Sequence, residues 1–304
     1  MNMEEKVTIE KTGWWKSFLK SEFFYHYKHN IPAIIGSILV VVAILVAVFG
    51  RFIAPQNPYD LTAISLADSY LPPVWLDGGK AGFLLGSDEQ GRDILSAIIY
   101  GSASSIMIGL VGMICSCAIG TTLGLLAGYF GGKVDMVMQR ILEVANGIPR
   151  LVIVTLMLLV FKPGILTIVI ALMLTEWIGM SRIARAEMLK LKEQEFVLAS
   201  RTLGAGSFFI IFKEVLPNII GPIITQVMFS IPTAIFTEAF LSFIGIGLAE
   251  PQASLGVLIN GGYQVLRMYP HVLVFPAIVI VLIMVCFSIL GDGLRDALDP
   301  QMRK

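Results

Sequence analysis

Charged residues are scarce in this sequence. Asp, Glu, Lys and Arg make up only 14% of its 304 residues, whereas 56% are apolar, and soluble domains carry about 25% charged residues. The mean hydropathy of +0.80 agrees with this deficit. The composition therefore excludes an ordinary soluble domain and predicts a multi-pass protein of the plasma or inner membrane, in contact with lipid.

Cysteine is also scarce, and both a net charge and long basic tracts are missing. The formal net charge is zero and no long run of Lys or Arg occurs, so we expect no nucleic-acid partner. The three cysteines lie in apolar runs without a nearby His, which indicates neither a disulfide framework nor a metal site. We expect Cys115, Cys117 and Cys286 to pack as small apolar side chains.

A phosphate-binding loop is missing as well. The glycine-rich stretch GYFGGKV, residues 128–134, lacks the first Gly and the final Ser or Thr of that motif, and has Ala127 and Val134 in their places. We therefore predict no catalytic residue, no cofactor bound by this chain, and no enzyme activity of the chain by itself.

Long uncharged runs are what the sequence does contain. Residues 31–50 would form about 30 Å of helix, enough to span a bilayer, and Arg51 follows directly, which favours an uncleaved anchor over a signal peptide. Residues 94–132 are too many for one crossing and too few for two. We predict one span over 104–128, preceded by an interfacial segment.

Further runs bring the total to six transmembrane helices in an all-α fold. The remaining predicted spans are 141–161, 163–180, 219–244 and 272–290. Four prolines interrupt them, as expected where helices bend around a cavity: Pro149, Pro222, Pro232 and Pro276.

The distribution of Lys and Arg predicts the orientation. With the N-terminus inside, the inner segments hold 16 of these residues and the outer segments five, so both termini are predicted to be cytoplasmic. The predicted division is a cytoplasmic tail 1–30, a first anchor 31–53, an extracytoplasmic loop 54–103, a transmembrane core 104–291 that includes a cytoplasmic loop 182–217, and a cytoplasmic tail 292–304.

Ionisable residues within spans are costly and become functional candidates. They are Arg150, Glu176 and Glu238, the last placed near the outer interface. Each is interpreted either as a paired structural group between helices or as a group that lines or gates a pore. In the second span, Gly120, Gly124 and Gly128 repeat every fourth residue and indicate close helix packing, within the chain or between subunits.

The loop 182–217 contains an unexpected short helix. Its first part continues the fourth span, and then EFVLASRTLGAG places apolar and small side chains on one face, followed by two glycines as a stop. The face comprises Phe196, Ala199, Ser200 and Leu203, the stop is Gly204 and Gly206, and Ser207 is the expected cap of the next helix. Such an exposed face fits a groove on another protein.

Residues 195–218 resemble the EAA loop of ATP-binding-cassette (ABC) importer permeases. Ala199, Gly204, Leu216 and Pro217 match that pattern, while Leu198 and Ser200 replace a Glu and an Ala. GSDEQGRDILS at 86–96 resembles the outer-loop signature of the dipeptide, oligopeptide and nickel permeases. Residues 128–140, 231–248 and 291–300 are similar to that family too. The likeness is greatest to the C-type oligopeptide permease subunit, although Arg150 and Leu255 depart from the pattern.

The resemblance implies a type I ABC importer permease fold and a subunit that moves oligopeptides or dipeptides. It also implies a homologous second permease, two ABC ATPases that use ATP and Mg, and an extracytoplasmic peptide-binding protein. The implied ATPase-coupling helix comprises Glu195, Phe196, Val197, Leu198, Ala199, Ser200, Arg201, Thr202, Leu203 and Gly204. Asp88, Arg92 and Asp93 are expected either to shape an outer docking surface or to form a turn and cap.

Three alternatives stay open from the sequence. Nickel, metallophore and glutathione importers share these motifs. A gradient-driven secondary transporter would need midplane ion coordination and often an internal repeat, which the sequence does not show. A scaffold without transport would leave the apolar-faced loop unexplained.

Overall fold

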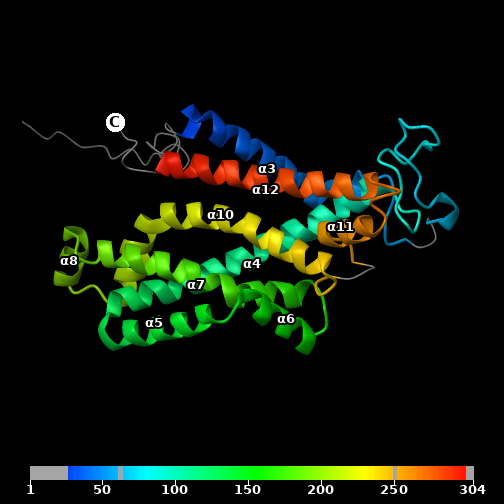
Figure 1. The fold of residues 1–304 in the computed structure, drawn as a ribbon. Coiled ribbons are helices and arrows are strands. Elements are labelled where there is room, and N and C mark those ends of the chain that lie inside the picture. The colour runs from blue at the N-terminus through cyan, green and yellow to red at the C-terminus, as the bar shows by residue number, and fades with distance from the viewer. Residues whose placement is uncertain (1–26, 61–63, 249–251, 299–304) are drawn as a thin grey trace, which may run out of the picture.

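The computed structural model describes residues 27–60, 64–248 and 252–298 (Figure 1). Within these ranges the regular elements are helices, and the β pairing is limited to one isolated bridge between Ser87 and Asp93. Most of the predicted N-terminal tail lies outside the described residues. The predicted C-terminal tail begins inside the last helix, α12.

Five helical segments are long and apolar enough to cross a membrane. They are α3 (Ile31–Phe49) with the 3-10 turn Gly50–Phe52, α4 (Ile94–Phe130), α7 (Ile165–Leu191), the continuous stretch Ser207–Phe243, and α12 (His271–Leu298). The continuous stretch consists of α9 (Ser207–Phe209), a π-helical segment (Ile210–Val215) and α10 (Leu216–Phe243).

The third predicted span is bent. Helices α5 (Gly132–Gly147) and α6 (Arg150–Val160) meet at 80° and count as a sixth crossing only if taken together. Pro149 has no N–H to donate, and it disfavours helical geometry for the residue before it. Ile148 is accordingly extended, with φ −91° and ψ 124°. Arg150, predicted near mid-span, is therefore the first residue of a new helix.

The second span also differs from its prediction. The segment predicted to precede it is continuous with it, because α4 is a single helix of 37 residues that begins at Ile94, where the Asp93 side chain caps it. No proline interrupts residues 94–130. At 1.5 Å per residue this helix is about 55 Å long and exceeds the bilayer's hydrocarbon core of about 30 Å. Similarly, α10 continues through Pro222 and Pro232, and α12 through Pro276.

The helices form an elongated bundle (Figure 1). α3 and α12 lie side by side along one edge, α5 and α6 lie along the opposite edge, and α4, α7 and α10 lie between them. The short helix α8 (Glu195–Thr202) lies at one end of the bundle. The loop that follows α3 and the helix α11 (Leu255–Gln264) lie at the other end. We call these the α8 end and the loop end.

The glycines of α4 allow close contact with α7. A Cβ atom on Gly120 would lie 2.5 Å from the carbonyl oxygen of Trp177, and one on Gly124 would overlap the carbonyl oxygen of Ser181. Gly128 faces the Met188 side chain in the same way. Of the two roles predicted for this motif, the structure shows packing within the chain.

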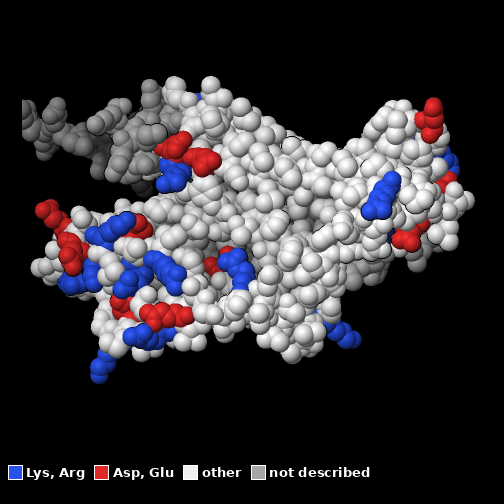
Figure 2. All heavy atoms as spheres, in the orientation of Figure 1, with Lys and Arg blue, Asp and Glu red and all other residues white. Residues whose placement is uncertain are grey.

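Charged side chains are concentrated at the two ends of the bundle. On the face shown in Figure 2, Lys, Arg, Asp and Glu gather at the α8 end and at the loop end, and one small charged group lies near the middle. The rest of that face is almost free of charge, as a surface in contact with lipid tails requires.

Candidate coupling helix and polar cavity

The α8 helix is a separate turn-bounded element. Three residues after α7 lead into it, and Gly204 ends it with φ +84°, a conformation that suits glycine. The Ala205 N–H donates to the carbonyl of Ser200 at 3.0 Å, which closes the end of the helix. Gly206, in extended geometry, precedes the next helix. The predicted cap at Ser207 is wrong, since Ser207 is already helical and makes no capping bond.

One side of α8 faces the bundle and the other faces outward. Val197 is fully buried, in a cluster with Leu125, Met188 and Ile211. Leu203 is 87% exposed and Leu198 is 45% exposed, and Ala199 is exposed between them. Ser200, predicted on the exposed face, is half-buried because it lies nearer to the Val197 side. The helix therefore presents small and apolar side chains outward.

Two polar contacts connect this end of the chain to α4. The Arg201 guanidinium carbon lies 5.5 Å from the centre of the Tyr129 ring, a cation–π contact. The Lys192 ammonium donates to the carbonyl of Gly128 at 3.4 Å. Together with the buried Val197, these contacts attach α8 to the ends of both α4 and α7.

A polar cavity of about 400 Å³ opens where α5 bends into α6. Its lining comes from five helices: Met113 of α4, Asn146 of α5, Arg150 of α6, residues 175–182 of α7, and residues 226–233 of α10. Met113, Glu176 and Ser230 lie near the middle of their helices, and Asn146 and Arg150 flank the bend between α5 and α6.

Arg150 and Glu176, predicted separately as pore or gate candidates, meet in this cavity. The Arg150 Nη1 lies 2.6 Å from the Glu176 Oε1. The Glu176 side chain is 8% exposed, whereas that of Arg150 is 42% exposed. This oxygen of Glu176 makes no well-aligned hydrogen bond, so the contact is an ion pair. The pair joins α6 to α7, as the structural interpretation predicted, and it also lines the cavity. A pore or gate role stays a prediction.

Sequence reasoning missed the uncharged half of this cavity. Gln226, Ser230 and Thr233 follow the helical spacing i, i+4, i+7 on α10, and the Gln226 side chain donates to the Ser230 hydroxyl at 3.2 Å. Arg182, assigned from the sequence to the inner loop, also contributes to the lining. The regular recurrence of polar residues in an apolar span is the signal that could have found these positions.

Glu238 lies elsewhere and is fully buried by the chain itself. Its carboxylate accepts hydrogen bonds from Ser105 at 2.7 Å and Ser242 at 2.9 Å. The N–H groups of Leu248 and Leu255 donate to those serine hydroxyls at 3.0 and 3.4 Å. The geometry is that of a structural hydrogen-bond network. Glu238 lies five residues before the end of α10, and its position near the outer interface stays a prediction.

The residues predicted to lie in an outer loop form a turn and a helix cap. The Asp88 carboxylate accepts hydrogen bonds from the backbone of Gln90 and from both the backbone and Nε of Arg92, the last at 2.6 Å. Asp93 accepts two from Ser96 as the cap of α4. Asp88, Arg92 and Asp93 are each less than a tenth exposed. This burial matches the turn-and-cap alternative and leaves little of these side chains for direct docking.

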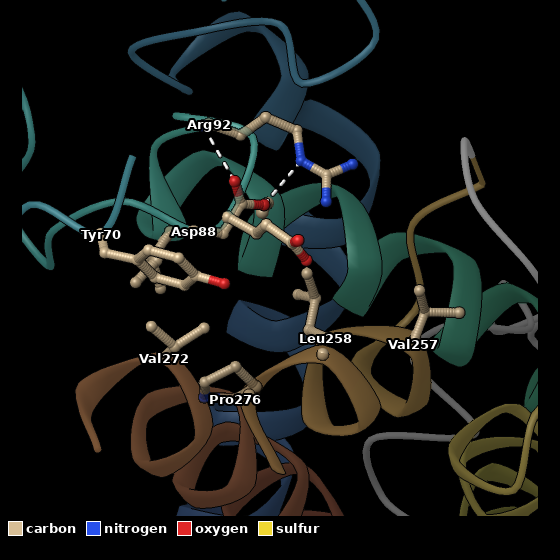
Figure 3. Close-up of a pocket in the computed structure, with 12 residues that line it drawn as sticks. Tyr70, Asp88, Arg92, Val257, Leu258, Val272 and Pro276 are labelled. Carbon is tan, nitrogen blue, oxygen red and sulfur yellow. Dashed lines mark hydrogen bonds and ion pairs between the residues drawn. The ribbon is translucent and has the colours of Figure 1, made fainter. Parts of the chain in front are cut away.

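A small pocket lies beside this turn. In Figure 3 the Tyr70 ring and the Asp88–Arg92 pair face Val272, Pro276 and Leu258. Burial raises the pKa of the Tyr70 phenol, and the nearby carboxylates, Glu89 first, raise it further. The pocket volume of about 40 Å³ admits a few water molecules at most, so we assign it no substrate. No group of three or more potential metal ligands occurs among the described residues.

Comparison with protein families identifies the class of the chain. Residues 120–304 match the family described as binding-protein-dependent transport system inner membrane component. The chain belongs to this family. Residues 17–73 match the N-terminal transmembrane domain of oligopeptide transport permease C. A chain of this family is a membrane permease subunit of an ABC importer and is not an enzyme by itself.

Individual relatives agree with this assignment. The dipeptide transport system permease protein DppC of Bacillus subtilis is 42% identical over 278 residues, which cover 91% of this chain and 84% of the relative. The oligopeptide transport system permease protein OppC of the same organism is 39% identical, with 99% and 94% covered. OppC of Escherichia coli K12 is 34% identical, with 99% and 96% covered.

A solved inward-facing structure of the MetNI methionine ABC transporter shares the fold. Its TM-score is 0.56 at 18% identity, over 67% of this chain and 96% of that chain. The all-helical architecture and this neighbour confirm the predicted type I importer permease fold.

Proposed function

We propose that this chain is a permease subunit of an ATP-driven peptide importer and that α8 is its contact with an ATPase. The relatives named above are dipeptide and oligopeptide permeases, which supports peptides as the substrate class. The single observation that carries the role of α8 is its geometry. It is anchored on one side and presents exposed small and apolar residues beyond the end of the bundle.

The α8 end faces the cytoplasm in this proposal, and both termini lie on the same side. The distribution of Lys and Arg, 16 against five, supports it. The separation of α8 and the outer loop to opposite ends of the bundle fits the same orientation. The loop end then faces the binding protein that delivers the substrate.

The complete importer contains more than this chain. A homologous second permease would complete the translocation path, and two ABC ATPases would bind ATP and Mg beneath it. The contacts that attach α8 to α4 and α7 give a mechanical reason for this assembly. When the ATPase pair closes, a helix held by Val197 and the Arg201–Tyr129 contact transmits movement to two long helices as a rigid unit.

The contact depends on backbone shape and small side chains. Ala199 lets the α8 backbone approach another surface closely, and Gly204 supplies the left-handed turn that ends the helix. Leu198 stands where the family pattern has Glu, so in this proposal the contact does not depend on a carboxylate at this position.

An arginine at Ala199 tests the proposal. We expect Ala199→Arg to insert and fold normally but to lose ATP-dependent peptide uptake, because the long side chain occupies the contact surface. Ala81→Arg is the matched control for ATPase binding, since Ala81 is also exposed but lies in the loop 54–93, at the opposite end of the bundle. Copurification with the tagged chain measures ATPase binding, and the ligand carried by the copurified binding protein reports the substrate class. Normal uptake by Ala199→Arg contradicts the role of α8.

A further inference from the structure

The charges around the polar cavity do not balance. Arg150 is paired with Glu176, but Arg182 makes no ion pair with another residue of the described chain. Arg182 is exposed toward the cavity, and Arg150 is 42% exposed. The cavity therefore holds two cations against one anion, and its other lining residues carry no charge. Such a site favours an anionic ligand, because a second negative charge would balance the excess positive charge.

The Arg150–Glu176 contact leaves donors available. Glu176 is nearly buried and takes one edge of the guanidinium, through Nη1. A guanidinium has five N–H donors in a planar fork and binds carboxylates in a bidentate manner. Glu176 thus orients Arg150 and at the same time competes with any anionic ligand for the N–H donors of Arg150.

The remaining lining suits a peptide backbone. Gln226, Ser230 and Thr233 offer amide and hydroxyl groups along one face of α10, and such groups bond to any peptide unit regardless of its side chains. A volume of about 400 Å³ lies within the range of small-molecule sites, about 300–1,000 Å³.

We propose that this cavity is a binding site for the C-terminal carboxylate of a peptide during transport. Arg150 takes the carboxylate, Arg182 supplies a second cation, and Glu176 positions Arg150 and holds it in the absence of peptide. This inference rests on the proposed function, since it requires that peptides pass the cavity.

Peptides with and without a terminal charge provide the test. The tagged chain is purified with its partner subunits and binding protein and is placed in lipid vesicles. ATP-dependent uptake is measured by mass spectrometry for a library of di- to pentapeptides and for the same sequences with C-terminal amides. Because the binding protein is the same throughout, a change in the acid-to-amide uptake ratio between variants reports the permease.

The two members of the ion pair are expected to behave in opposite ways. Arg150→Gln lowers the acid-to-amide ratio about tenfold, the value of one charge-assisted hydrogen-bonded contact. Glu176→Gln raises the ratio, because it removes the competing anion. A pair with a purely structural role predicts a different result, in which both variants reduce uptake of both libraries alike, and that result overturns the proposal.

Two further variants keep the test decisive. Arg182→Gln breaks no ion pair of the described chain and is expected to lower the ratio even if Arg150→Gln fails to assemble. Arg140→Gln is the control, since Arg140 is 76% exposed, pairs with Glu143 and lies outside the cavity. An unchanged ratio in Arg182→Gln and in any assembled Arg150→Gln overturns the site while peptide import stands. If the wild-type complex takes up no peptide with ATP, the proposed function fails, and the site fails with it.

Discussion

Arg185 of α7 and Asp135 of α5 form a bidentate ion pair, with Nε–Oδ1 and Nη2–Oδ2 distances of 2.5 and 2.6 Å. Both side chains are largely covered, at 29% and 19% exposure. Leu142 is the one buried residue of α5. The ion pair therefore holds a weakly packed helix against α7 between α8 and the polar cavity.

Breaking this pair is expected to destabilise the protein. Arg185→Ala should cost about 1–3 kcal/mol, because it leaves a partly covered carboxylate without its partner. Arg185→Lys should cost less, since it keeps the charge but loses the bidentate geometry. Thermal unfolding in detergent measures both effects. Exchange of the two residues, Arg185→Asp with Asp135→Arg, should restore part of the loss, and equal stability of all variants would contradict this role.

The contact between Arg201 and Tyr129 predicts a graded effect on coupling. Tyr129→Phe keeps the ring and should preserve uptake, whereas Tyr129→Leu removes about 0.5–1 kcal/mol of cation–π attraction and should loosen α8. Peptides imported per ATP hydrolysed is the quantity to measure. We expect this ratio to fall in Tyr129→Leu and in Arg201→Gln by similar factors, with no further fall in the double variant. Additive losses would show that the two side chains act separately.

The α4 glycines predict a large response to a single methyl group. Gly124→Ala places a Cβ atom against the carbonyl of Ser181, so α4 and α7 must move apart, at a cost of about 1–3 kcal/mol. Gly147→Ala is the matched control, because that position has open space around it. Folded yield and melting temperature in detergent should fall for Gly124→Ala alone. Equal values for the two variants would show that the interface adapts without loss.

The buried network around Glu238 predicts that stability depends on a hydrogen-bond acceptor at position 238 rather than on the size of the side chain there. Glu238→Leu leaves the Ser105 and Ser242 hydroxyls without their acceptor and should cost about 2–4 kcal/mol. Glu238→Gln keeps one acceptor oxygen and should cost less. Because these serines receive the N–H groups of Leu248 and Leu255, proteolysis should increase near α11. Wild-type proteolysis in Glu238→Leu would contradict the network's role in holding that segment.

Much of the fold was predictable from local sequence. Apolar length indicated the first, fourth, fifth and sixth spans, even though the fourth and fifth contain Glu176 and Glu238, since every crossing must satisfy its own backbone in lipid. The stop at Gly204 followed from local geometry in the same way. The bend at Pro149 was expected, but its 80° angle was not, because the angle depends on what packs on either side.

The sequence did not show which polar side chains are buried or which of them pair with one another. Glu238 and the Asp88 turn contain the same residue types as an exposed site, and only their neighbours show that they are enclosed. The same is true of Arg150 and Glu176, which are 26 positions apart in the chain and meet because α5 breaks and α6 packs on α7.

The sequence by itself determined that this chain is a helical membrane permease with a short helix, partly exposed, in the loop 182–217. Hydrophobic length, charge distribution and local motifs carry that information, since each can be read directly from short stretches of the sequence. The tertiary structure alone decided that Arg150, Glu176, Arg182 and the polar face of α10 surround one cavity. Their proximity arises from the packing of three separate helices, α6, α7 and α10. The physical reason is that such contacts are set by the whole bundle and not by any one segment.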